Sequence, residues 1–395
     1  MTETTVPRSD PADDVARRDA LAARVVTATI DALELFHIYV GDRLGLYRAL
    51  AERGPLDPAG LAAAAGIALR YAQEWLEQQA VAGVLAVVGL PGPAGEDNPA
   101  GQVRRYRLPA GHAEVLLDGT SLCHQAPLAS GVVGVARALP AVLDAFVTGG
   151  GVPYRHYGPD LRWCIGRTNR PLFLHQLGRD WIPAMPDVHR RLQSDPPARV
   201  ADIGCGTGWS AIAIALAYPK ARVDGFDLDE ASIGEARVHA AAHGVTDRVA
   251  FHVADAARLT GATTATYDLA CAFEALHDMT DPIGALIAMK TLVGGKGTVL
   301  IADEAVAETF TAPGDELERF HYGWSALHCL PCGLADHPAE ELTRRVLAGT
   351  GTVLRPATLR AYARAAGFDD IEVLPIYHDV WRFYRLTRRH PSDPS

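Results

Sequence analysis

One glycine-rich run constrains the fold of this chain more than any other feature: Gly204-Cys205-Gly206-Thr207-Gly208, directly after Val200-Ala201-Asp202-Ile203. An apolar run that carries one acid and then turns through three glycines is typical of a buried strand leading into a helix N-terminus. Glycine suits such a turn because the backbone needs unusual torsions and because a ligand can lie against bare peptide groups. The run predicts an α/β fold with a binding site at the end of its first strand.

Two further apolar runs end in acidic residues. Asp227 follows Val223-Asp224-Gly225-Phe226, about twenty residues after the glycine run, where an acid is placed to accept both hydroxyls of a ribose. Asp255 follows a third run, 249–253, and lies at the same sheet edge, in reach of an adenine amino group. Three strand ends with such residues predict a pocket for a nucleoside.

The spacing of the glycines indicates which nucleoside to expect. A dinucleotide-binding turn has a further glycine three residues after Gly206, where this chain has Trp209, so an NAD(P) site is the less favoured alternative. With Gly208, and with Asp202 two residues before the first glycine, the run resembles motif I of class I S-adenosylmethionine-dependent methyltransferases. The resemblance covers roughly residues 196–388. It implies a Rossmann-like, doubly wound α/β sheet and S-adenosyl-L-methionine as cofactor.

The resemblance also implies contacts with each part of that cofactor. The backbone of the glycine turn would line the methionine part, and Asp202 would orient its ammonium group. Phe273 and Glu274, at the end of the fourth strand, would lie beside the sulfonium. The cofactor-binding residues expected on this basis are Asp202, Gly204, Cys205, Gly206, Asp227, Leu228, Asp255, Ala256, Phe273 and Glu274.

Length and composition bound the class of protein. A chain of 395 residues is expected to form two domains, and its 48% hydrophobic content allows a large core. The net charge of −10 disfavours loose binding to nucleic acid or to an anionic membrane. We find no apolar run of spanning length and no signal-peptide pattern, and the six cysteines are scattered, as in reduced cytoplasmic proteins. A cytoplasmic enzyme with no membrane or nucleic-acid partner is the expectation.

The chain divides into four segments. Residues 1–18 are polar and are expected to be disordered, and residues 19–117 form a small helical domain. Residues 118–195 are a helical connector. The cofactor-binding domain is expected at 196–395, with a substrate-cap insertion at 304–352 after the fifth strand.

The helical domain has the layout of a winged helix. Asp57-Pro58 predicts the start of a short helix, a longer helix follows over 69–82, and residues 84–88 and 104–108 form a strand pair. The longer helix carries Glu74 and Glu77, which would face phosphates if it entered a DNA groove. Such domains precede many small-molecule methyltransferases, where they form the homodimer and wall the substrate pocket, and we expect these roles here.

His277 is the candidate catalytic residue. It follows the fourth strand, where this fold exposes its cleft, and an imidazole with a pKa near 6.5 suits a general base. The alternative is that His277 only packs or bonds its own loop through Asp278. Plant-type O-methyltransferases share the two-part plan, but their usual His-Asp motif is not clear after the fifth strand here.

The insertion holds a second group of candidates. We expect His321, Trp324 and His328 to contact substrate, with either histidine as an alternative base and with core packing as the competing interpretation. His328, Cys329 and Cys332, flanked by His321 and His337, have the residue types of a zinc site, but a single Cys-x-x-Cys is a weak signal and no metal is expected.

The sequence therefore predicts an enzyme that methylates a small molecule in secondary metabolism, with oxygen as the expected target. N- or C-methylation is the competing reaction. A winged-helix regulator that binds the cofactor without catalysis is the alternative of another class.

Overall fold

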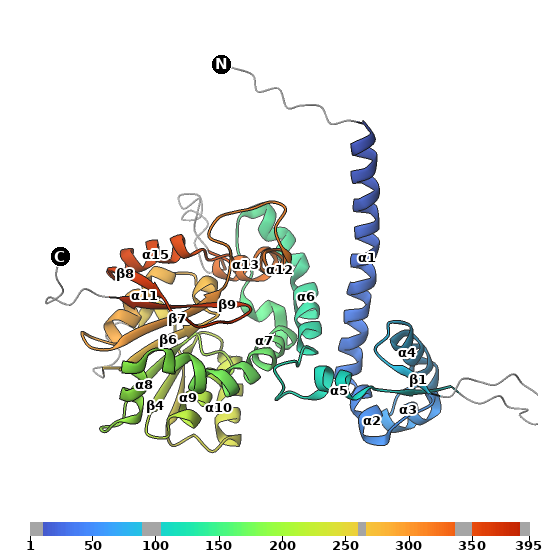
Figure 1. Cartoon of the computed structure of the whole chain (residues 1–395), viewed down its shortest axis with the longest axis horizontal. Coiled ribbons are helices and arrows are strands. Elements are labelled where there is room, and N and C mark those ends of the chain that lie inside the picture. Colours follow the sequence, from blue (N-terminus) through green and yellow to red (C-terminus); the bar gives the residue numbers. More distant parts are fainter. Residues whose placement is uncertain (1–10, 89–103, 260–265, 336–349, 388–395) are drawn as a thin grey trace, which may run out of the picture. The chain divides into compact units, whose positions relative to one another are not determined.

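The computed structural model describes residues 11–88, 104–259, 266–335 and 350–387, which form two compact units, 1–129 and 130–395 (Figure 1). The first unit is mainly helical. The second contains a seven-stranded sheet with helices on both faces, so the doubly wound α/β prediction is confirmed.

Helix α1 (Pro11–Arg43) opens the first unit and corrects the expectation of disorder for residues 11–18, while residues 1–10 lie outside the described residues. Asp13 and Asp14 lie in its first turn, where negative charge is favoured by the helix dipole. The helix continues through Gly41. It gives way to the next helix at Gly45, which takes the left-handed φ of 68°.

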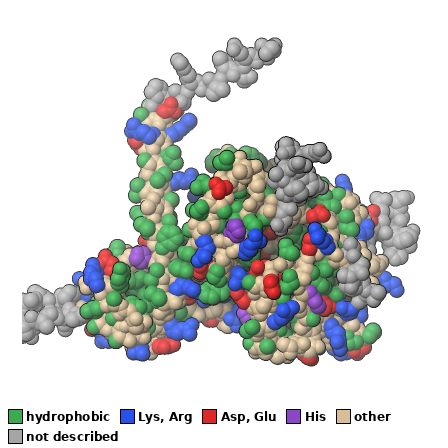
Figure 2. All heavy atoms as spheres, turned by 180° about the vertical axis from the view of Figure 1, so that it is seen from behind, with side chains coloured by type: hydrophobic (Ala, Val, Ile, Leu, Met, Phe, Trp, Pro, Cys, Tyr) green, Lys and Arg blue, Asp and Glu red, His purple; other side chains and the backbone are tan. Residues whose placement is uncertain are grey.

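Much of the apolar surface of α1 is exposed. Val26, Ile30, Leu33 and Val40 are each more than a third exposed and follow the 4-3-7 spacing of one helix face. Figure 2 shows hydrophobic side chains along the length of this helix. These four side chains do not belong to the hydrophobic core of the unit.

The remainder of the first unit follows the predicted order of elements. Asp57 caps α3 by accepting a hydrogen bond from the Gly60 amide at 2.7 Å, with Pro58 at the first helical position. The predicted strand pair is confirmed, since β1 and β2 are antiparallel. The elements are α2 (Leu46–Arg53), α3 (Pro58–Ala65), α4 (Leu69–Val81), β1 (Ala86–Val88), β2 (Arg105–Arg107) and α5 (Ala110–Leu117). Their core is built around Tyr47, Leu50, Leu61, Trp75, Leu76 and Tyr106.

Helix α6 (Pro127–Thr148) begins the helical connector and is unusually apolar. By length and composition alone it could cross a membrane, so the expectation that no apolar run reaches that length is wrong for these residues. Its glycines permit close packing: a Cβ at Gly131 would lie 2.6 Å from Cys164, and one at Gly134 would lie 2.8 Å from Leu161. One face of α6 is therefore packed against α7. The connector continues through η1 (Tyr154–Tyr157), α7 (Gly158–Leu172), the π-helical η2 (Phe173–Trp181), η3 (Ile182–Ala184) and α8 (Pro186–Gln193).

The sheet has the order β5-β4-β3-β6-β7-β9-β8. The first five strands in this order are parallel, and the last two form the expected antiparallel closing hairpin. Chain order reverses between β3 and β6, which is where open α/β sheets bind ligands at their carboxyl ends. The strands are β3 (Arg199–Ile203), β4 (Arg222–Asp227), β5 (Val249–Val253), β6 (Leu269–Phe273), β7 (Thr298–Glu304), β8 (Asp370–Val373) and β9 (Trp381–Thr387).

Apolar side chains fill both faces of the sheet. One cluster joins it to η2, α8, α9 (Trp209–Ala217) and α10 (Glu230–Ala242), and the other joins it to α11 (Pro282–Leu292) and α15 (Pro356–Ala365). Two short turns, η4 (Ala256–Arg258) and η5 (Leu276–Asp278), follow β5 and β6. The expected cap after β7 contains α12 (Glu316–Trp324), η6 (Ser325–Cys329) and α13 (Leu330–Gly333), and His337 lies outside the described residues.

Candidate active site

The glycine turn between β3 and α9 has the unusual backbone torsions that its sequence predicts. Gly204, Gly206 and Gly208 all have positive φ. A Cβ at Gly208 would lie 2.6 Å from Phe251, so this residue allows the turn to pack against the sheet. A Cβ at Gly206 would meet nothing within 4 Å, so the backbone there is open on the side where a ligand can approach.

Asp227 holds this turn from the end of β4. Its Oδ2 accepts a hydrogen bond from the Gly206 amide at 2.8 Å, and its Oδ1 accepts one from the Asp229 amide at 2.8 Å. Burial raises the pKa of Asp227, and the two amide bonds oppose that rise. Each carboxylate oxygen keeps a free lone pair that can accept from a ligand hydroxyl.

Asp202 lies almost fully buried on β3. Its Oδ2 accepts a hydrogen bond from the hydroxyl of Ser210 on α9, and the Cys271 thiol lies 3.8 Å from Oδ1. Burial raises the pKa of Asp202 to about 7, against the opposing effect of the Ser210 bond. The carboxyl group therefore changes charge near neutral pH.

The other predicted cofactor residues have varied surroundings. Asp255 caps η4 by accepting from the Ala257 amide at 3.0 Å, and it pairs with Arg258 at 3.2 Å. Leu228 is 62% exposed, directly after the carboxyl end of β4. Phe273 is buried in an aromatic cluster, with its ring centroid 5.4 Å from that of Phe173.

Glu274, directly after β6, is the one non-glycine residue of the described chain with positive φ, at 50°. Asn169 of α7 donates a hydrogen bond to its carboxylate. Burial raises the pKa of Glu274. On the neighbouring strand β7, burial raises the pKa of Glu304 well above its usual value, and repulsion from the Glu274 carboxylate adds to this rise. Both shifts favour the protonated carboxyl groups, and the strained backbone at Glu274 is typical of a functional position.

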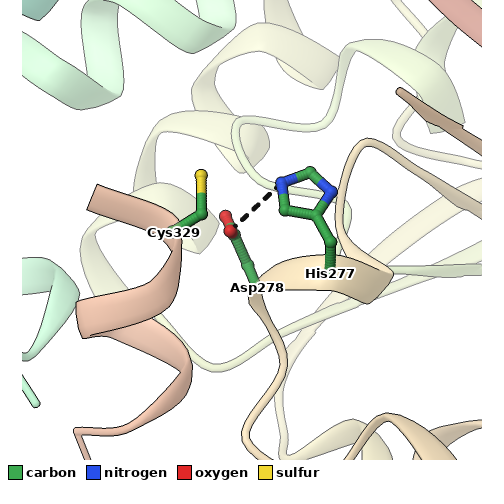
Figure 3. A group of neighbouring side chains, drawn as sticks. All are labelled: His277, Asp278 and Cys329. Atoms are coloured by element: carbon green, nitrogen blue, oxygen red, sulfur yellow. Dashed lines mark ion pairs between the residues drawn. The ribbon is translucent and has the colours of Figure 1, made fainter. Parts of the chain in front are cut away.

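His277 lies on η5, next to this pair, and is 2% exposed. Its Nδ1 is 2.8 Å from Oδ1 of Asp303 on β7, and its Nε2 is 3.1 Å from Oδ1 of Asp278 (Figure 3). Burial alone would lower the pKa of His277, but the charges of Asp303 and Asp278 outweigh it and raise the pKa well above its usual value. The two acidic neighbours thus favour the protonated form of the His277 ring.

The cap contributes two further buried histidines. His321 of α12 has Nδ1 3.5 Å from Oε2 of Glu304, and burial lowers the pKa of His321 to about 4. His328 of η6 packs edge-on against Tyr157, at 4.8 Å between centroids, and burial lowers its pKa also. Trp324 lies 6.4 Å from the His328 ring. The predicted substrate residues are thus on the cap, and His321 approaches the acidic pair at the sheet edge.

Among the residues that the structure describes, the group that could hold a metal ion combines a cap cysteine with two residues of η5. Cys329 lies beside His277 and Asp278, with all their donor atoms within 4.8 Å of one another. Burial raises the pKa of Cys329 to about 12, so the group is a thiol. Cys332 does not belong to this trio.

Sequence reasoning named Asp278 as a possible partner of His277, but it missed two other polar partners of the site, Asn169 and Asp303. Asp303 could have been predicted from the sequence, because it is an acid at the carboxyl end of a strand, like Asp227. Asn169 could not, because it reaches Glu274 from a helix more than a hundred positions away.

Comparisons with known proteins agree with this architecture. Residues 194–330 match the family model of a methyltransferase domain. The ubiquinone biosynthesis O-methyltransferase of Aromatoleum aromaticum is 29% identical over 226 residues, 57% of this chain and 84% of that protein. Its counterpart from Paraburkholderia phymatum is 29% identical over 230 residues, 57% of this chain and 85% of that protein.

Two solved structures resemble nearly the whole chain. The mitomycin 7-O-methyltransferase MmcR superposes with a TM-score of 0.62 at 20% identity, covering 95% of this chain and 100% of that one. Human N-acetylserotonin methyltransferase in complex with SAM gives 0.63 at 17% identity, covering 98% and 99%. The second unit thus has the class I methyltransferase fold. The chain is an S-adenosylmethionine-dependent methyltransferase.

Proposed function

We propose that this enzyme methylates an oxygen atom of a small molecule and that His277 is its general base. The observation that carries this proposal is the 2.8 Å contact between Nδ1 of His277 and Asp303, which fixes the ring and leaves Nε2 as the nitrogen that can take a proton. A buried carboxylate on the far nitrogen also stabilises the imidazolium that forms. The MmcR structure and the ubiquinone biosynthesis relatives carry O-methyltransferase names, which supports oxygen as the target.

Proton transfer at His277 needs a preparatory step. Because the raised pKa keeps the resting ring charged, Nε2 first gives up a proton. Asp278, with 28% of its side chain exposed, offers the way out to solvent. The neutral Nε2 then accepts the proton of the acceptor hydroxyl as that oxygen attacks. General-base catalysis of this kind contributes about 10²- to 10⁴-fold in rate.

S-adenosylmethionine supplies an electrophilic methyl group on its sulfonium. The chain has to align the acceptor oxygen in line with that methyl and exclude water, which contributes up to about 7–11 kcal/mol. We assign binding of the cofactor to the glycine turn and the strand ends. The open backbone at Gly206, the free lone pairs of Asp227 and the buried carboxyl of Asp202 support this assignment.

We propose that the first unit is a winged-helix-type domain that forms a homodimer. The exposed apolar face of α1 supports this role, because a contiguous stripe of this kind is typical of a helix that packs on a partner. The acids Glu74 and Glu77 on α4 disfavour a DNA groove as that partner. We also propose that the methyl acceptor is a product of secondary metabolism and that the enzyme is cytoplasmic.

The test combines a product assay with one variant. Wild-type enzyme is given S-adenosylmethionine with a deuterated methyl group and a panel of phenols, amines and carbon acids, and products are identified by mass spectrometry. We expect O-methylated phenols and S-adenosylhomocysteine. His277→Ala should lower the rate by about 10²-fold or more, without changing the Kd for S-adenosylhomocysteine. His252→Ala, an exposed histidine on β5, is the matched control and should change neither.

Other outcomes would redirect the assignment. Methylated amines or carbon acids alone would show an N- or C-methyltransferase. An unchanged rate in His277→Ala would remove this residue as the base. Cofactor binding without turnover of any acceptor, together with a gel shift of genomic DNA, would favour the regulator.

A further inference from the structure

Three side chains from two distant segments meet beside the proposed base. His277 and Asp278 lie on η5 after β6, and Cys329 lies at the end of η6 in the cap. A ring nitrogen of His277, a carboxylate oxygen of Asp278 and Sγ of Cys329 all lie within 4.8 Å of one another, and Nε2 is the His277 nitrogen that contacts Asp278. Figure 3 shows the three side chains facing one another across a small space.

The donor atoms form a zinc-type set. An imidazole nitrogen, a thiolate and a carboxylate oxygen bind Zn²⁺ at about 2.0–2.3 Å, which places tetrahedral ligands about 3.3–3.6 Å apart. Nε2 of His277 lies 3.1 Å from Oδ1 of Asp278, and no two donor atoms of the three residues are more than 4.8 Å apart. The ligand separations of a tetrahedral zinc site fall between these two distances. Mg²⁺ and Ca²⁺ prefer oxygen ligands alone and would be rejected by the sulfur and the nitrogen. Small side-chain movements would complete the site for a borderline-soft cation.

A further buried histidine, His328, adjoins the trio. His328 is 3% exposed, and its Nδ1 lies 3.4 Å from Sγ of Cys329. Its Nε2 makes no hydrogen bond to any of the described residues. A buried polar atom without a partner is uncommon, and here it lies across the ring from the nitrogen that contacts Cys329. The partly exposed Asp278 provides an approach from solvent.

We propose that His277, Asp278 and Cys329 bind one zinc-like divalent cation, and that the bound cation stops methyl transfer by occupying Nε2 of His277. The fourth coordination position stays open to water. The inhibition rests on the proposed role of His277 as base, whereas cation binding does not. Cys329 takes no part in the methyl transfer itself, so its removal should abolish the inhibition and keep the basal reaction.

Cobalt binding tests the site without reference to activity. The full-length enzyme is stripped with a chelator and titrated with Co²⁺. We expect one equivalent to bind with visible d–d bands and a near-ultraviolet thiolate-to-cobalt band. Cys329→Ser should lose the thiolate band, and Cys332→Ser, three residues further on, should keep it. Absence of one-equivalent binding to wild type, or a thiolate band that survives Cys329→Ser, would overturn the proposal.

Two further measurements cover the remaining outcomes. X-ray absorption of the zinc-loaded wild type needs no variant and should show one sulfur at about 2.3 Å with nitrogen or oxygen neighbours at about 2.0 Å. A first shell without sulfur would overturn the site even if Cys329→Ser does not fold. At a zinc concentration that slows the wild type at least tenfold, Cys329→Ser should keep more than half its rate. Cobalt binding through Cys329 with no inhibition would refute the base assignment and the inhibition, and leave the cation site standing.

Discussion

Replacing Asp227 by alanine removes one carboxylate that serves two purposes in the proposed site. In the unliganded protein its oxygens accept from the Gly206 and Asp229 amides, each at 2.8 Å. In the complex its remaining lone pairs would accept from the ribose hydroxyls. Alanine can do neither, so we expect weaker cofactor binding and a looser glycine turn.

The size of the effect follows from a single ribose bond. A hydrogen bond to a charged group contributes about 1.5–3 kcal/mol. Since about 1.4 kcal/mol corresponds to a tenfold change in Kd, loss of one such bond raises the Kd about 10- to 150-fold. Loss of the second hydroxyl and of the two amide contacts acts in the same direction. The single-bond value is therefore a lower bound.

Titration calorimetry with S-adenosylhomocysteine measures the change directly. Asp227→Asn should be intermediate, because it keeps one oxygen acceptor and loses the charge. Asp370→Ala, an exposed acid on β8 at the far edge of the sheet, is the control and should bind like the wild type. A Kd for Asp227→Ala within twofold of the wild-type value would refute the ribose assignment.

Three other predictions follow from the same geometry. The pKa of Asp202 is raised to about 7, and the ligand's ammonium group favours the ionised carboxylate. Affinity for S-adenosylhomocysteine should therefore rise as the pH increases through 7. A Kd from calorimetry that stays constant from about pH 6 to 8 would contradict this. Alanine is strained at the positive φ of both Gly206 and Gly208, so each variant should lose about 1–3 kcal/mol of the free energy of unfolding in denaturant melts. Gly208→Ala should lose more, because its new Cβ also meets Phe251; equal stability losses would count against the open approach at Gly206. Ile30→Asp with Leu33→Asp should convert a dimer to a monomer in light scattering, and an unchanged mass would exclude this face of α1 as the interface.

The sheet and its binding edge could be predicted from sequence because their signals are local. An apolar run, a glycine turn and a terminal acid occupy neighbouring positions, and the predicted strands pair in the order that the fold requires. The antiparallel pair of β1 and β2 was predictable for the same reason. The prediction for the first turns of α1 was wrong. A polar segment with several acids was taken as disordered, although acids in the first turn of a helix are stabilised by the helix dipole.

The surroundings of His277 could be predicted only in part. Its position after a strand marked it as a candidate base, but its pKa depends on Asp303, which lies on the neighbouring strand. Cys329 reaches the same space from the cap, and no spacing rule relates it to a histidine on η5. Such contacts join segments that are far apart in the sequence and meet at one edge of the sheet, so they can be found only from the three-dimensional structure.

The central claim is that the carboxyl ends of β3, β4 and β6 hold S-adenosylmethionine next to His277. A crystal structure with S-adenosylhomocysteine at saturating concentration tests it most directly. The account predicts the adenosine across the glycine turn, with ribose hydroxyls about 2.5–3.0 Å from Asp227 and the sulfur on the side of His277. A well-ordered complex with the ligand elsewhere, or with this edge of the sheet empty, would contradict it.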